Sequence, residues 1–207
     1  MQLQIASLTR EEIHHLLSTA ISPLPIALIS TISPEGIFNA APFSYICPIC
    51  SKPSLICVSI GLREREKKDT IKNIEYSNDF VVNVVDENII RQTVQASADY
   101  PYGVDELKVT GLTALPCEKV KSPRIAESKV NLECRLIQKL EFTEELREGL
   151  GKGLRSVIFG EVLLAHIQDG VWVNGRIDPG LLKPIGRMGK DLYCRTDDIF
   201  ELKPAPP

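Results

Sequence analysis

The sequence predicts an antiparallel β-barrel with a few peripheral helices, built as a single domain over residues 1–207. Apolar, β-branched runs of strand length recur along the chain and end at turns that contain proline or glycine. Few stretches have helical spacing, and no internal repeat or low-complexity linker divides the chain. Many short strands with few helices are typical of a barrel, and 207 residues suit a barrel built as one domain.

A short amphipathic helix is predicted near the N-terminus. The segment Thr9-Arg-Glu-Glu12 is a capping box, because the Thr9 hydroxyl and the Glu12 carboxylate can each satisfy an N–H group that the first turn leaves open. Four apolar residues at helical spacing then share one face of this helix: Ile13, Leu16, Leu17 and Ala20.

A β-hairpin follows this helix. Pro23 and Pro25 end the helix and start the first strand, since proline cannot continue a helix interior. Residues 26–32 are apolar and β-branched enough for a buried strand. Residues 33–36, Ser-Pro-Glu-Gly, form a turn with proline and glycine in fitting positions, and residues 37–44 return antiparallel.

Further strands are expected from apolar runs that lie between turn residues. These segments are residues 55–60, 80–85, 130–142, 155–168 and, as a turn with a strand, 170–175. Residues 98–128 hold prolines and glycines with few periodic signals, so we interpret them as a long excursion over the barrel surface. A loop of that length is uncommon unless it serves a function.

Helices are predicted beside these strands. Residues 67–77 form a helix with Ile71 and Ile74 facing inward. Asp86 is a suitable N-cap for another helix that reaches about Ala96. Short pieces of helix or loop are expected at residues 144–150 and 178–182.

Composition and charge exclude several classes of function. A net charge of −3 argues against a nucleic-acid binder, although Arg63, Arg65, Lys67 and Lys68 form a local basic cluster or a solvated loop. No segment approaches the roughly 20 apolar residues that cross a bilayer, and residues 1–20 lack the apolar core of a signal peptide. We therefore expect no membrane association, a cytoplasmic location and reduced cysteines.

Polar residues gather on the predicted hairpin. Ser30 and Thr31 end its first strand, and Asn39, Ala41 and Ser44 lie on its second. Hydroxyls, an amide and bare backbone suit a planar ligand with a polar edge, because neutral donors and acceptors satisfy such an edge. Alternatively, Ser30 and Thr31 are ordinary solvent-facing strand residues and Asn39 is a turn residue.

The start of the helix at residues 67–77 suits an anion, because a helix N-terminus offers unpaired N–H groups and partial positive charge. Lys68 adds a full charge and Thr70 a hydroxyl donor. Asp69 repels phosphate and is instead predicted to be the N-cap. Arg63 and Ser59 are further phosphate candidates. The alternative is an ordinary capped helix start.

Together these segments resemble the flavin reductase-like family of FMN-binding split-barrel proteins. The resemblance extends from about Pro23 to Leu202. Besides the segments above, it includes Tyr100-Pro-Tyr-Gly-Val-Asp-Glu106, Gly111-Leu112, Ala126-Glu-Ser128, Leu132-Glu-Cys-Arg-Leu136, Gly160-Glu-Val162 and Arg187-Met-Gly189 with Tyr193.

The resemblance implies a split barrel that binds FMN, or FAD, as a homodimer with flavin at the subunit boundary. It implies an NAD(P)H-dependent flavin reductase that transfers hydride to flavin N5 and serves a partner monooxygenase or another electron acceptor. Two alternatives remain. One is an FMN-binding electron-transfer protein without nicotinamide activity, resembling flavoredoxin. The other is a distant relative of split-barrel amine oxidases or a non-catalytic flavin-binding module. No dinucleotide fingerprint or phosphate-binding loop motif is present, so NADH or NADPH would stack directly against the flavin.

The resemblance also implies roles for single residues. The hairpin residues named above would line the isoalloxazine and ribityl groups. Lys68 and Thr70 would hold the phosphate, and Asp69 would hold the turn. Arg187 would face the flavin or a dinucleotide phosphate, and Tyr193 would stack on a ring; the alternatives are a surface ion pair and a core tyrosine. We predict no catalytic acid–base residue, because the cofactor carries the chemistry in such proteins.

Cysteine and histidine offer two further hypotheses. The segment Cys47-Pro-Ile-Cys50 follows a strand and has no second pair to complete a zinc set, so we expect no metal site and keep a redox role as the alternative. His166 alternates in a long strand, which favours a structural role over one near the flavin or nicotinamide. His14 and His15 are expected to be solvated on the first helix.

Overall fold

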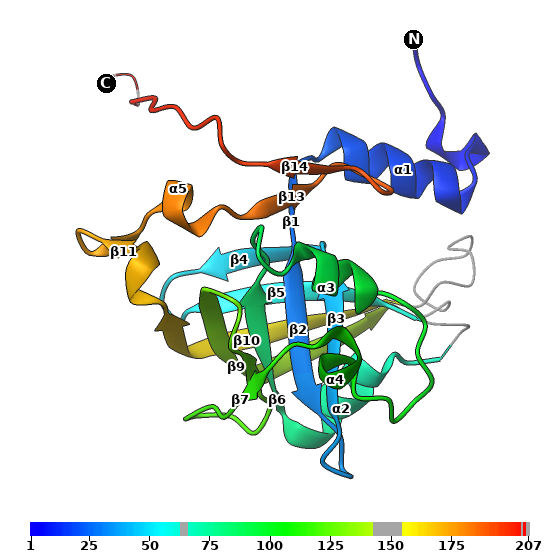
Figure 1. Ribbon diagram of the computed structural model, residues 1–207. Coiled ribbons are helices and arrows are strands. Elements are labelled where there is room, and N and C mark those ends of the chain that lie inside the picture. Colours follow the sequence, from blue (N-terminus) through cyan, green and yellow to red (C-terminus); the bar gives the residue numbers. More distant parts are fainter. Residues whose placement is uncertain (63–65, 143–154, 204, 206–207) are drawn as a thin grey trace.

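A computed structural model describes residues 1–62, 66–142, 155–203 and 205 of the chain (Figure 1). Strands outnumber helices, as predicted. The strands are β1 (Leu24–Pro25), β2 (Ala27–Ile32), β3 (Phe38–Phe43), β4 (Ile46–Cys50), β5 (Leu55–Gly61), β6 (Asp79–Val84), β7 (Ala114–Leu115), β8 (Arg124–Ile125), β9 (Val130–Phe142), β10 (Arg155–Ile167), β11 (Trp172–Val173), β12 (Arg176–Ile177), β13 (Ile185–Arg187) and β14 (Tyr193–Arg195). The α-helices are α1 (Arg10–Ala20), α2 (Asp69–Ser77), α3 (Ile90–Gln95), α4 (Glu106–Thr110) and α5 (Pro179–Leu182).

The central sheet has seven strands in the order β3-β2-β6-β9-β10-β5-β4. Every pairing among the described strands is antiparallel, and the sheet curves into the barrel visible in Figure 1. A smaller sheet, β1-β13-β14, lies with α1 on one side of the barrel. The second and third strands form the predicted hairpin, and Gly36 closes its turn with a φ of +79° that a side chain would disfavour.

Two apolar clusters make up the core because β2 is covered on both faces. Ile29 packs with Phe80 and Ile158 inside the barrel. Leu28, the residue before it, lies in the second cluster with Ile89 and Leu107, which belong to the start of α3 and to α4. A strand buried on both sides reads as a continuous apolar run, which explains the pattern of residues 26–32.

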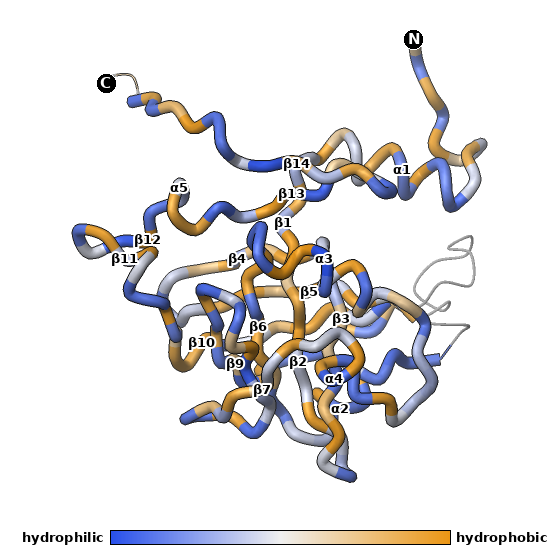
Figure 2. The backbone as a smooth tube through the Cα atoms, in the orientation of Figure 1, coloured by the Kyte–Doolittle hydropathy of each residue, from blue (hydrophilic) through white to orange (hydrophobic). Residues whose placement is uncertain are grey.

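The first helix forms as predicted but does not enter this core. The Thr9 amide donates to Glu12 Oε2 (2.7 Å), and the Glu12 amide donates to Thr9 Oγ1 (3.2 Å). Of the helix residues only Ser18 is buried, and Leu17 is 47% exposed. Figure 2 shows hydrophobic residues recurring along α1, outside the barrel. The apolar face that the sequence predicts is therefore largely open to solvent in one chain.

Two predicted helix starts were wrong. The second helix begins at Asp69 itself, and the N-cap is Lys68, which makes no side-chain cap bond. Asp69 instead pairs with Lys72 (3.5 Å) one turn along. The third helix begins at Ile90, and its N-cap is Ile89. The buried Asp86 carboxylate does not cap this helix, because it accepts from the Asn88 amide (2.9 Å) and pairs with Lys129 (3.3 Å).

Other differences from the prediction lie in the connecting segments. The excursion at residues 98–128 contains α4 and the short β7–β8 pair. The predicted piece at residues 144–150 lies outside the described residues. Within the described ranges, no helix is long and apolar enough to span a membrane.

The packing of β10 against β6 yields a stability prediction. A Cβ at Gly160 would lie 2.5 Å from Phe80 Cζ, and Phe80 is buried to 1% exposure. Gly160→Ala should therefore lower the free energy of unfolding by about 1–3 kcal/mol in urea titrations. Gly61→Ala is the matched control, because a Cβ there would lie 4.0 Å from Arg155 Cζ, an ordinary van der Waals contact. Equal effects of the two substitutions would contradict this account.

Candidate functional site

Two adjoining cavities lie at the edge of the barrel where β3 meets the start of α2. The first has a volume of about 350 Å³ and is lined by β3, by the first turn of α2 and by the segment at residues 96–102. The second has a volume of about 240 Å³ and lies between α1 and the barrel. Pro42 and Lys68 line both, so a single elongated ligand could span them.

A buried hydrogen-bond network around Asn39 builds the floor of the first cavity. Asn39 Oδ1 accepts from Thr31 Oγ1 (3.2 Å) and from Thr70 Oγ1 (3.0 Å). Asn39 Nδ2 donates to Glu106 Oε1 (3.0 Å). Thr31 Oγ1 in turn accepts from Asn73 Nδ2 (3.0 Å). The network thus joins two strands and two helices.

Glu106 is a buried cavity residue that the sequence analysis did not include among the candidate site residues. Its second oxygen accepts from the Ala40 amide (3.2 Å), and the residue is only 6% exposed. Burial raises the pKa of this carboxyl above its ordinary value, and the nearby Asp69 adds to the shift. Asp105 caps α4 by accepting from the Lys108 amide (3.2 Å), which fixes Glu106 at the first position of the helix. In the sequence Glu106 is the last residue of the segment Tyr100-Pro-Tyr-Gly-Val-Asp-Glu106, which belongs to the family resemblance but was given no role.

The start of α2 brings cations to both cavities. Lys68 Nζ lies 5.8 Å from the centroid of the Phe43 ring and lines both spaces. Lys72 Nζ lies 5.1 Å from the Tyr102 ring centroid, on the opposite wall of the first cavity. The partial positive charge at the N-terminus of α2 and these ammonium groups make the first cavity suitable for an anion.

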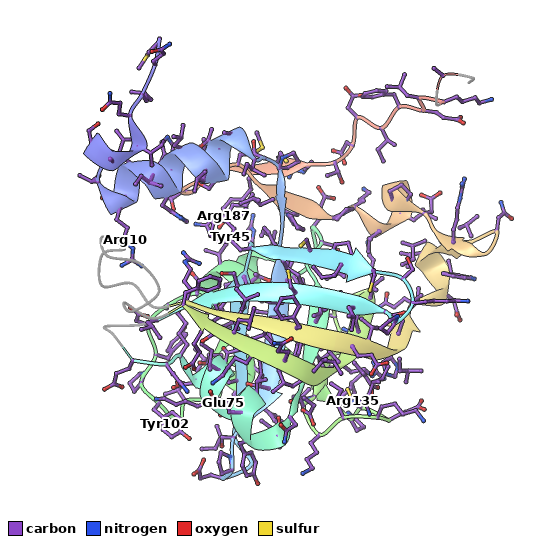
Figure 3. All side chains as sticks on the ribbon, turned by 180° about the vertical axis from the view of Figure 1, so that it is seen from behind. Arg10, Tyr45, Glu75, Tyr102, Arg135 and Arg187 are labelled. Atoms are coloured by element: carbon purple, nitrogen blue, oxygen red, sulfur yellow. The ribbon has the colours of Figure 1, made fainter. Side chains whose placement is uncertain are left out.

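The second cavity is lined by several cations around one tyrosine. Figure 3 shows Arg10, Tyr45 and Arg187 near the space between α1 and the barrel. Arg155 lies over the Tyr45 ring (5.1 Å to the centroid), and the Tyr45 hydroxyl hydrogen-bonds His14 Nδ1 (3.1 Å). Burial, followed by the neighbouring arginines, lowers the pKa of His14. His14, expected to be solvated, therefore forms part of this wall.

Most predicted site residues line one of the two cavities. Asn39, Ala41, Lys68, Asp69 and Thr70 line the first, and Ser44, Ser59, Lys68 and Arg187 line the second. Thr31 lies beneath the first cavity and supports Asn39. Arg63 falls outside the described residues.

Ser30 and Tyr193 lie elsewhere. The Ser30 hydroxyl is fully buried and donates to the Pro123 carbonyl (2.5 Å) while it accepts from Asn83 Nδ2 (2.9 Å). The alternative that Ser30 and Thr31 face solvent was wrong, since both are 0% exposed. Tyr193 lies opposite Arg187 on β14 and lines a separate cavity beside α3. Arg187 donates to the Lys190 carbonyl (3.0 and 3.2 Å) and forms no ion pair in the described part of the chain.

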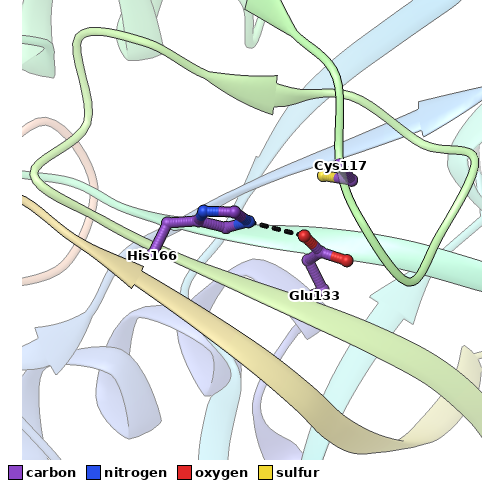
Figure 4. A group of neighbouring side chains, drawn as sticks. All are labelled: Cys117, Glu133 and His166. Carbon is purple, nitrogen blue, oxygen red and sulfur yellow. Dashed lines mark hydrogen bonds and ion pairs between the residues drawn. The ribbon is translucent and has the colours of Figure 1, made fainter.

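A separate cluster contains His166, Glu133 and Cys117, whose ligand-type atoms lie within 4.8 Å of one another (Figure 4). Glu133 is fully buried and accepts from His166 Nε2 (2.5 Å) and from the amides of Glu118 (2.9 Å) and Lys119 (2.6 Å). Burial alone would raise the pKa of Glu133, but these bonds lower it. We assign the cluster to anchoring the loop at residues 117–119 on β9 and β10, a structural role for His166.

Residues 19–179 match the family described as "Flavin reductase like domain". The chain therefore belongs to this family. It is 27% identical to nitrilotriacetate monooxygenase component B from Bacillus cereus, with a TM-score of 0.91 and 98% of both chains covered. It is 29% identical to 2-nitrobenzoate 2-nitroreductase of Pseudomonas fluorescens, with a TM-score of 0.88 over 99% of this chain and 96% of that one.

The fold is a split barrel. A candidate flavin reductase with a split barrel domain from Shewanella frigidimarina superposes with a TM-score of 0.84, covering 99% of this chain and all of that one, at 22% identity. This likeness, with the antiparallel seven-stranded sheet, confirms the fold class that the sequence predicted.

The raised pKa of Glu106 predicts a pH-dependent contribution to stability. The folded protein holds the Glu106 proton more tightly than the unfolded chain, whose carboxyl titrates near its ordinary value of 4.5. The stability that the protonated Glu106 carboxyl contributes is therefore fully present below about pH 4.5, and it is lost as the pH rises through the pKa of the folded protein. In urea titrations from pH 4 to 8, the wild-type protein should lose stability relative to Glu106→Gln as pH rises. A difference that does not vary with pH would contradict the assignment.

Proposed function

We propose that the protein binds FMN across the two adjoining cavities and acts as an NAD(P)H-dependent oxidoreductase in the cytoplasm, as one domain over residues 1–207. The observation that carries this proposal is the joining of an anion-suited cavity to an arginine-rich one at Lys68. The first cavity alone has a volume within the usual range of ligand sites. Membership of the flavin reductase-like family supports flavin as the ligand.

The first cavity fits the phosphate end of FMN. Lys68 would supply a full positive charge, and the first-turn amides of α2, including that of Thr70, would donate to phosphate oxygens. The Thr70 hydroxyl already donates to Asn39, so we assign it to holding the wall in place. Asp69 would hold the turn through its ion pair with Lys72, which directs its negative charge toward a cation.

The remainder of the flavin would lie along β3 toward the second cavity. Asn39 uses both acceptor positions and one donor inside the protein, so its main role is to hold the strand. The ring edge would then be satisfied by backbone groups near Ala41 and by the hydroxyls of Ser44 and Ser59. When bound, FMN supplies hydride acceptance at N5, a chemistry for which no protein acid or base is needed.

The second cavity would also receive the nicotinamide dinucleotide, beside the flavin ring. Arg10, Arg155 and Arg187 give this space positive charge, which suits the dinucleotide phosphates. The likeness to a monooxygenase component B and to a nitroreductase supports an electron acceptor beyond the flavin, and we propose a partner oxygenase protein as that acceptor.

We further propose a homodimer. The apolar side chains of the N-terminal segment and α1 are exposed in one chain: Leu17 is 47% and Ile21 64% exposed. Because α1 also forms one wall of the second cavity, a partner chain seated here would help to enclose the ligand. Sedimentation should give a dimer at micromolar concentration, and a monomer that retains FMN would contradict the proposal.

The function is tested by loading the protein with FMN and adding NADH or NADPH under anaerobic conditions. We expect uptake of about one FMN per chain and loss of its visible absorption when one of the two donors is added. Protein that takes up no FMN would disprove the flavin site. Protein that binds FMN but is reduced by neither donor would retain the site and disprove the reductase activity.

Lys68→Ala should weaken FMN more than riboflavin, because only FMN carries the phosphate. One charge-assisted hydrogen bond contributes roughly 1.5–3 kcal/mol, so FMN affinity should fall about 10- to 150-fold while riboflavin affinity changes little. Lys108→Ala is the control, because Lys108 is 85% exposed, pairs with Asp105 and lines neither cavity. Equal losses for FMN and riboflavin would place the phosphate elsewhere.

A further inference from the structure

Three cysteines lie on the β4–β5 hairpin, and the structure pairs them differently from the Cys47-Pro-Ile-Cys50 motif. Cys47 Sγ lies 3.3 Å from Cys57 Sγ. The Cys50 thiol points to its own turn and donates to the Pro53 carbonyl (3.0 Å). A register shift between Pro48 and Cys50 separates the two cysteines of the motif in the ladder.

We propose that Cys47 and Cys57 form a reversible disulfide that fastens β4 to β5 beside the second cavity. The two residues stand directly opposite each other in the antiparallel ladder. Opposite residues of such a ladder have Cα atoms about 4.5–5.5 Å apart, and disulfides accept about 4.4–6.8 Å. The bond can therefore form by rotation of side chains, without movement of the strands.

The position of β4 explains what this bond would do. In the described part of the chain β4 is one of the two edge strands of the central sheet and pairs only with β5. Pro48 lies within it and has no N–H to donate, which is typical of an edge strand. A covalent link at Cys47 would therefore hold this edge strand to its single neighbouring strand.

The link would also act on the wall of the second cavity. Side chains two residues apart in a strand share a face, so Cys57 shares its face with Ser59. Tyr45 directly precedes β4, and its carbonyl accepts from the Ser59 amide (2.8 Å). Val58, between Cys57 and Ser59, points into the core instead. Both Tyr45 and Ser59 line the second cavity. Oxidation would thus fix the cavity wall formed by the β4–β5 hairpin, whether or not a flavin is bound.

The two thiols have different roles in the reaction. Cys47 is exposed and meets an oxidant first, whereas Cys57 is half-buried. Burial, and the contact with Cys47, raise the pKa of Cys57 to about 11, so Cys57 keeps its proton until Cys47 has reacted. A low-molecular-weight disulfide is the oxidant. The Cys47 thiolate attacks one of its sulfurs and releases one thiol, and Cys57 then loses its proton and displaces the second thiol from Cys47. Two protein thiols are oxidised, and the small disulfide is reduced to two thiols.

The experiment treats the full-length protein with oxidised glutathione and then maps the cross-linked peptides by mass spectrometry. We expect a loss of two free thiols per chain, a peptide that joins Cys47 to Cys57, full reversal by dithiothreitol, and a Tm raised by about 5 °C or more. Cys50→Ser is the matched control on the same strand and should behave as the wild-type protein does. Cys47→Ser should lose both the cross-link and the shift in Tm.

Three results would overturn the proposal. A cross-link between Cys47 and Cys50 would assign the reaction to the sequence motif. Retention of all thiols in the folded wild-type protein, under conditions that oxidise the urea-unfolded chain, would show that the pair does not react. A shift in Tm that persists in folded Cys47→Ser would show that the stabilisation has another origin.

Discussion

The side chain of Asn39 is the interaction on which the cavity region depends. It is buried between the hairpin, α2 and α4, and three of its hydrogen-bonding positions are used by Thr31, Thr70 and Glu106. A buried amide that lost these partners would cost about 1–3 kcal/mol for each group left unsatisfied. The network therefore fixes the position of α2 relative to β3, and with it the position of Lys68 at the junction of the two cavities.

This constraint explains why polar residues lie in such an apolar part of the barrel. Thr31 and Asn39 stand directly opposite each other in the β2–β3 ladder, on a sheet whose neighbouring residues are buried aliphatics. Networks of this kind are favourable only when nearly every member is satisfied. Glu106 completes it from a helix that lies far along the chain, which is why α4 packs against β3. The need to satisfy the hydrogen bonds of Asn39 thus holds β3 and the N-terminus of α2 in place beside the cavities.

Sequence reasoning succeeded where the signal is local and failed where it depends on tertiary packing. Strands such as β9 and the capping box at Thr9 were predicted because alternation and capping are written into a few adjacent residues. The five-residue α4 is too short to show periodicity, and its Glu106 acquires meaning only beside β3. Asp69 was predicted to be the N-cap of α2 because acidic residues favour that position. The N-cap is instead Lys68, so Asp69 is the first residue of the helix, and its carboxylate pairs with Lys72.

The candidate site shows the same division. The hairpin and the start of α2 could be predicted as site elements, since their residues share a motif, and most of them line the cavities. Ser30 is buried because its side chain lies on the face of β2 that contacts Pro123 and Asn83. The sequence alone does not show which residues cover that face. His14 and Tyr45 meet only because α1 folds back over the barrel edge. The pairing of Cys47 with Cys57 likewise required the register of β4.

The central claim is that a flavin lies with its phosphate at the start of α2 and its ring along β3. An ¹⁵N-labelled sample titrated with FMN tests this claim most directly, because each backbone amide reports on its own surroundings. We predict that the largest amide shifts fall on residues 39–44 and 68–72, with smaller ones at residues 97–102. Shifts concentrated at the His166 cluster, or on the β11–β12 hairpin, would contradict the account.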